Sequence, residues 1–124
     1  MFDHGSMFKH WAVFIDGTKK SEKILLNALG SEGRFRFEES IEDARKSSSL
    51  LEMIELCKVD STQIEQIKVI ARSMPIKSHV PGWNCQDYVL ELFEALEETG
   101  IAPGQDGAYI SIKRELIAKQ DGLV

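Results

Sequence analysis

The feature that most constrains the fold is the order of strand and helix patterns along the chain. Residues 9–16 are rich in aromatic and β-branched side chains, which is typical of a strand. Residues 23–29 form a second apolar run that ends at a glycine. Residues 34–38 alternate charged side chains with phenylalanine, the pattern of a half-buried strand. Turn-forming residues separate these runs, so the first 40 residues predict a three-stranded antiparallel meander.

Helical signals follow in the second half of the chain. Residues 62–73 carry apolar side chains at helical spacing and stop before a proline, which disfavours helix in the residue ahead of it. Polar side chains at its start can cap a helix. Two capping boxes are possible there: one pairs Thr62 with Glu65, and the other pairs Asp60 with Gln63.

Two more helices are expected, and one segment is ambiguous. Residues 84–99 predict the longest helix, with Gly100 where a glycine commonly ends one, and residues 108–119 predict a terminal helix. Residues 50–59 contain good helix formers, but their length between polar breaks also allows a strand. The expected fold class is α+β, with helices packed on an antiparallel sheet.

Length and charge narrow the possible functions. The chain has 124 residues, enough for one domain, and 20 acidic against 15 basic residues give a net charge of -5. That balance disfavours a dedicated nucleic-acid binder. No apolar stretch approaches the roughly 18 residues that cross a membrane, so we expect no membrane anchor and a cytoplasmic protein. Nothing in the sequence indicates an oligomeric state.

The first residues have a separate interpretation. Gly5-Ser6-Met7 is similar to a cloning junction followed by a start methionine. We therefore interpret residues 1–6, including His4, as the remnant of a cloning junction and residues 7–124 as a single domain.

The two cysteines differ in their expected roles. Cys57 and Cys85 are too few for a disulfide framework and do not form a C-x-x-C pair. Cys57 lies in an apolar run and is expected to pack. Cys85 opens the helix at 84–99, where partial positive charge and free N–H groups favour a thiolate and can stabilise an oxyanion. We expect a depressed pKa for Cys85 and consider it a candidate nucleophile; the alternative is a small packing residue.

A nucleophilic cysteine needs a base and a group that orients the base. His10 begins the first expected strand, and Asn27 is a polar residue in the apolar second strand. Trp11 and Trp83 lie beside the candidate residues and can wall a substrate pocket. Each has a plain alternative: a structural histidine, an asparagine that satisfies a turn, and packing tryptophans. His79 is expected in a surface loop.

Two motifs together carry a resemblance to a known superfamily. The chain reads His10-Trp11-Ala12-Val13-Phe14-Ile15 and, much later, Trp83-Asn84-Cys85-Gln86-Asp87-Tyr88-Val89. This order resembles the permuted branch of the NlpC-like, papain-like cysteine peptidase superfamily, in which the histidine strand precedes the cysteine helix. The lecithin:retinol acyltransferase group has a similar H-W-A strand and N-C-E-H-F-V helix start, and the PPPDE isopeptidases share the order. Short fungal proteins with H-W-A-L and N-C-Q-x-W-V motifs are the most similar, over about residues 8–119.

The resemblance implies a site and a fold. Cys85 matches the nucleophile and His10 the base. Asn27 matches the third catalytic position, in a segment that is similar to Y-H-A-x-G, where histidine is commoner. The resemblance also implies that residues 50–59 form a strand of a permuted papain-like core.

The implied activity is that of a cysteine-dependent hydrolase or acyl transferase, which forms an acyl-enzyme with a peptide, amide, thioester or ester substrate. No cofactor or metal is expected. The alternatives are an inactive binding module of the same fold, a lipid acyltransferase, which commonly needs a membrane anchor, and an α+β domain whose cysteine packs the core.

Overall fold

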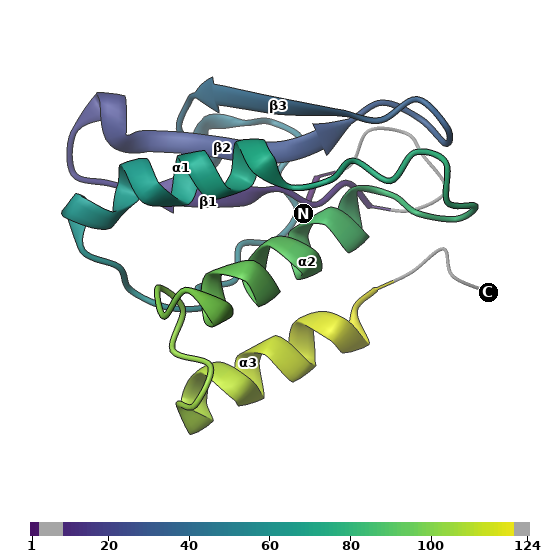
Figure 1. Cartoon of the computed structure of the whole chain (residues 1–124). Helices are drawn as coiled ribbons and strands as arrows, with labels where there is room; N and C mark the ends of the chain where they lie inside the picture. Colours follow the sequence, from purple (N-terminus) through teal and green to yellow (C-terminus); the bar gives the residue numbers. More distant parts are fainter. Residues whose placement is uncertain (3–8, 121–124) are drawn as a thin grey trace.

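The computed structural model describes residues 1–2 and 9–120. Three antiparallel strands form one sheet in the order β1-β2-β3, and three α-helices follow them in the chain (Figure 1). The strands are β1 (Val13–Asp16), β2 (Lys23–Leu29) and β3 (Arg36–Ile41), and the helices are α1 (Ile64–Ser73), α2 (Cys85–Glu98) and α3 (Gly107–Ala118). Single 3-10 turns lie at Lys20–Glu22, Ala44–Lys46 and Ser61–Gln63.

The sheet buries both of its faces, but to different depths. Alternation along β1 and β2 sends one set of apolar side chains, including Val13 and Leu26, into the main core with the helices. On the opposite face, Leu25 packs with Phe2 and Ala44 in a smaller cluster. His10 and Asn27 line a hollow on this second face. The helices therefore cover one face of the sheet, and the polar side chains of His10 and Asn27 lie on the other face.

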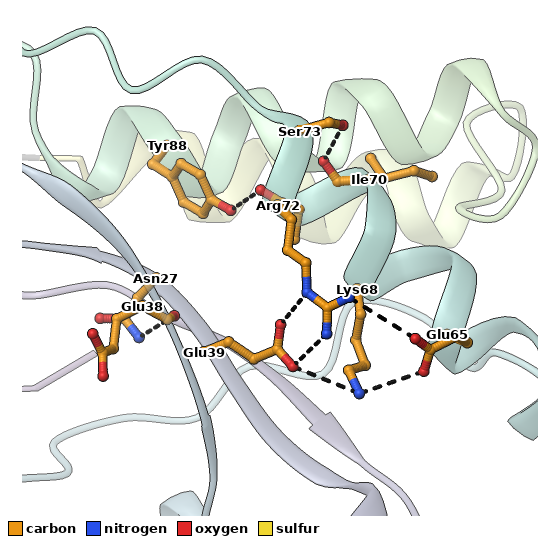
Figure 2. A network of polar contacts seen from close by, with 10 residues as sticks. Asn27, Glu38, Glu39, Glu65, Lys68, Ile70, Arg72, Ser73 and Tyr88 are labelled. Atoms are coloured by element: carbon orange, nitrogen blue, oxygen red, sulfur yellow. Dashed lines mark hydrogen bonds and ion pairs between the residues drawn. The ribbon is translucent and has the colours of Figure 1, made fainter.

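The helices pack as a layer on the sheet. In Figure 1, α1 and α2 lie against the sheet and α3 lies beyond α2. The Tyr88 hydroxyl on α2 donates to the Ala71 carbonyl at 2.9 Å, which ties α2 to α1. Figure 2 shows the ion pair between α1 and β3, in which the Arg72 guanidinium donates hydrogen bonds to both carboxylate oxygens of Glu39, at 2.8 and 2.9 Å. This bidentate ion pair links α1 to β3, which is an edge strand of the sheet.

The expected fold class is confirmed as an α+β domain with helices on an antiparallel sheet. The helices match their expected ranges to within two residues, and of the two capping boxes the structure contains the one between Asp60 and Gln63. The first strand is shorter than expected, since His10 and Trp11 precede β1. The third lies slightly later, at Arg36–Ile41, with buried Phe35 just before it. None of the described helices has the length and apolar character needed to cross a membrane.

The expectation of a strand at residues 50–59 was wrong. After a single bridge at Leu50, the segment has no ladder partner among the described residues. The place beside the start of β1 is taken by Met1 and Phe2, and Phe2 pairs with both His10 and Leu50. The segment is therefore held away from the edge of β1, and several of its apolar side chains, such as Leu51 and Met53, are exposed.

Gly100 ends α2 with a φ of 80°, a conformation that strains any residue with a Cβ. We expect Gly100→Ala to lower the free energy of unfolding by about 1 kcal/mol, measured by urea denaturation. Gly107→Ala is the matched control, because a Cβ there meets nothing within 4 Å and that glycine has no positive φ. Equal destabilisation by both substitutions would contradict this explanation.

Candidate active site

The start of α2 is built by its capping residue. Asn84 accepts a hydrogen bond from the Gln86 N–H at 2.9 Å, and its own N–H donates to an Asp87 carboxylate oxygen at 2.9 Å. This reciprocal box makes Cys85 the first residue of the helix, which agrees with its predicted place in the first turn. The Cys85 side chain is 1% exposed, so the sulfur lies inside the protein.

Contacts from this helix start flank His10 on both sides. The Gln86 side chain is fully buried, and its Nε2 donates to the Lys9 carbonyl at 2.8 Å. The backbone N–H of Trp11 lies close enough to the Cys85 sulfur to favour the thiolate form. The β1–β2 ladder ends at Val13, which leaves this N–H outside the ladder. Since residues 9 and 11 both contact the helix start, the backbone of His10 lies beside Cys85.

The His10 ring is oriented by a chain of hydrogen bonds from the sheet. Its Nε2 lies 3.1 Å from Asn27 Oδ1. Figure 2 shows the next bond of the chain, in which Asn27 Nδ2 donates to the Glu38 carbonyl on β3. The bond to Glu38 sets which end of the amide faces the imidazole. An amide oxygen only accepts, so His10 Nε2 carries the proton and Nδ1 is the basic nitrogen. The predicted partnership of His10 and Asn27 therefore exists in the folded chain.

The pKa of the Cys85 thiol differs from the value that the sequence led us to expect. Burial raises its pKa above the ordinary value, and this outweighs the backbone N–H groups of Trp11, Cys85 and Gln86, which favour the thiolate. The expectation of a depressed pKa considered only the helix start, whereas the fold also removes water from the sulfur. In the described state the thiol is protonated at neutral pH.

Met1 and Phe2 cover this region. Phe2 is 6% exposed, exchanges two backbone hydrogen bonds with His10 at 2.7 and 2.9 Å, and places its ring 6.2 Å from the imidazole. The Met1 ammonium donates to the Glu52 carbonyl at 3.0 Å, and it lies near enough to Cys85 that a thiolate there would raise the pKa of the ammonium. Of the segment interpreted as a cloning remnant, residues 3–6, with His4, lie outside the described residues.

The other predicted residues occupy different places. Trp11 is 2% exposed and lines a large cavity. Trp83 packs edge-on against Phe35 and donates from its indole to Glu91 at 2.7 Å, so its contacts are those of a packing residue. Cys57 is half-buried outside any strand, and burial raises its pKa. His79 is exposed in its loop.

Two hollows adjoin the site. One of about 230 Å³ is lined by His10, Asn27 and polar residues of β3 on the second face of the sheet. The other, of about 690 Å³, lies between β1, the helices and residues 52–59.

Sequence reasoning missed Gln86, although it stands inside the N-C-Q motif. A glutamine on the buried side of an apolar helix is the available signal, because a buried amide needs a partner.

The comparisons identify the family. A sequence family designated DUF6540, a family of unknown function, matches residues 2–103, so the chain belongs to it. The matched range includes both His10 and Cys85. No curated protein and no solved structure matches the chain.

We expect Gln86→Met to lower the free energy of unfolding by about 1 kcal/mol, because it removes the buried bond to Lys9. Gln105→Met is the control, since Gln105 is exposed in a loop. Chemical denaturation of both variants measures the difference. No difference between them would mean that the Gln86 contact does not hold the helix start in place.

The raised pKa of Cys85 predicts the pH dependence of its alkylation. Only the thiolate reacts, and burial disfavours the thiolate. In a Cys57→Ser background, iodoacetamide should react slowly at pH 7 and faster as pH rises, with an apparent pKa above about 8.5, the value of a free cysteine. A plateau reached below pH 7 would show that the helix start and its amides dominate instead.

Proposed function

We propose that this chain is a cysteine-dependent hydrolase or acyl transferase with Cys85 as nucleophile and His10 as base. One observation carries the proposal: Cys85 opens α2 between contacts to both neighbours of His10, and the His10 ring is held by Asn27. Nucleophile, base and orienting group then come from three separate elements. The order of a histidine segment before a cysteine helix also supports a permuted papain-like core as the finer description of the α+β fold.

The chemistry follows from the roles of these groups. His10 Nδ1 takes the thiol proton as the Cys85 sulfur attacks the carbonyl carbon of an amide, thioester or ester. The Cys85 N–H is the group at the helix start that the Asn84 capping contacts do not use, and it stabilises the oxyanion. The leaving amine, thiol or alcohol departs with the proton from His10. Water, or an acceptor amine, then attacks the acyl-enzyme and regenerates the thiol.

The resting state sets the order of these steps. Because the thiol is protonated and buried, its proton leaves during the attack rather than beforehand. Residues packed over the sulfur must shift before a substrate carbonyl can reach it. The proposed mechanism is therefore general-base catalysis, in which the histidine removes the thiol proton during the attack. It does not start from a thiolate–imidazolium pair that exists before the substrate binds.

A second candidate function is a catalytically inactive binding module of the same fold. The observation that favours it is the burial of the sulfur together with its raised pKa. The two candidates differ in whether an acyl group ever forms a bond to Cys85.

An activated thioester, p-nitrothiophenyl acetate, tests the proposal. We expect acetylation at Cys85, located by peptide mass spectrometry, and release of the aryl thiol. Cys57→Ala should keep both, and Cys85→Ala should abolish both. His10→Ala should slow the acetylation about 100-fold or more, the usual share of a general base.

Asn27→Ala separates orientation from folding. It should slow acetylation less than His10→Ala does, because the base remains but its ring is no longer held. Thermal melting of each variant shows that the fold persists. Equal acetylation of Cys57 and Cys85, or a rate that His10→Ala leaves unchanged in a folded protein, would refute the mechanism and favour the binding module.

A further inference from the structure

The outer edge of β1 is open. The sheet order places β1 at one side, and no strand among the described residues pairs with its outer edge. The Gly17 N–H donates to the Glu22 carbonyl across the turn toward β2. Hydrogen-bonding groups alternate along a strand, so those of Phe14 and Asp16 face the open side. An open edge is a template for another strand.

A cavity of about 690 Å³ lies beside this edge. Residues 52–59 form its other side, and apolar side chains of the helices, such as Val89 and Phe93, form its floor. A volume of this size is typical of ligand sites. We refer to the space between β1 and residues 52–59 as the β1 slot.

The chain shows how the β1 slot holds a backbone. Phe2 exchanges two hydrogen bonds with His10 on one side, while Met1 bonds to Leu51 and Glu52 on the other, at 2.9 and 3.0 Å. The two residues thus lie between two chain edges as a short inserted strand. The Met1 side chain packs on the main core and that of Phe2 on the opposite cluster, so both faces accept apolar side chains. Extended backward from Met1, the strand path runs antiparallel to β1.

A second observation points to a ligand. Trp11 lines the cavity, is 2% exposed, and its indole N–H has no hydrogen-bond partner among the described residues. A buried donor without an acceptor is costly, and its nitrogen is closed to solvent in the described state. A small shift of the packed side chains would let a carbonyl oxygen in the cavity accept from it. A peptide backbone supplies such carbonyls as well as groups that pair with a strand edge.

We propose that the β1 slot binds an extended peptide with a run of consecutive apolar residues, added to the sheet as a strand antiparallel to β1. Backbone pairing with Phe14 and Asp16 gives the affinity, and the apolar lining selects the side chains. The proposal does not depend on thiol chemistry at Cys85.

The probe is the N-acetylated, C-amidated hexapeptide Lys-Val-Leu-Ile-Val-Lys, titrated into ¹⁵N-labelled protein. The chain has two tryptophans, so the spectrum holds two indole N–H signals. We expect that of Trp11 to shift, while that of Trp83, already bonded to Glu91, stays in place. Amide hydrogen exchange at Phe14 and Asp16 should slow at least tenfold at saturation. Cys85→Ala should bind equally well, which separates this proposal from the proposed catalysis.

The control peptide has the same sequence with methyl groups on alternate backbone nitrogens, which removes pairing but keeps the apolar side chains. Ile54→Trp fills the cavity, since Ile54 lines it, and should weaken binding at least tenfold while thermal melting shows a folded protein. Leu56→Trp is the second filling variant, and Val69→Trp on the exposed side of α1 is the control.

Three results would overturn the proposal. The first is the absence of binding, and the second is equal binding of the methylated peptide, which would mean apolar adhesion without a strand. The third is protection of the Phe14 and Asp16 amides in the free protein, which would mean that residues 52–59 close on β1 as its fourth strand.

Discussion

The contact between the start of α2 and the segment that leads into β1 determines how the two halves of the domain meet. The Gln86 amide donates to the Lys9 carbonyl, and the Trp11 N–H lies near the Cys85 sulfur, so both neighbours of His10 lie beside the first residues of the helix. This contact joins positions 77 residues apart in the chain. It places the Cys85 thiol next to the segment that contains His10.

The electrostatics of the site are a balance between burial and backbone amides. The helix start and three N–H groups favour the Cys85 thiolate, but loss of water favours the thiol by more. On the second face of the sheet, Asn27 and the Glu38 carbonyl fix the His10 tautomer and leave Nδ1 as the basic nitrogen. In the described state the Cys85 thiol is therefore buried and protonated, while His10 is held by Asn27 on the other face of the sheet.

Much of the fold could be predicted because its signals are local. The capping residues of α2, the glycine after it and the alternation in β2 all act within a few residues of the chain. The pairing of His10 with Asn27 was expected only from the resemblance to the papain-like superfamily, because the strand pattern by itself also allowed an asparagine that satisfies a local turn. Residues 50–59 could not be placed from sequence, because their state depends on competition with Met1 and Phe2 for the edge of β1.

The pKa of Cys85 was mispredicted for a related reason. Position at a helix start can be recognised in the sequence, but the depth of burial depends on the tertiary packing of both ends of the chain. The same holds for Gln86, whose partner is a backbone carbonyl that no side-chain pattern marks.

The proposed mechanism needs a basic Nδ1 on His10, so the tautomer of this ring is the decisive measurement. Long-range ¹H–¹⁵N correlation spectra of the imidazole rings, with His10→Gln to assign the signal, report which nitrogen carries the proton. The structure predicts a proton on Nε2 near neutral pH, and loss of this preference in Asn27→Ala. A proton on Nδ1 in the unmodified chain would contradict the proposed mechanism, since the basic nitrogen would then be Nε2, which faces Asn27.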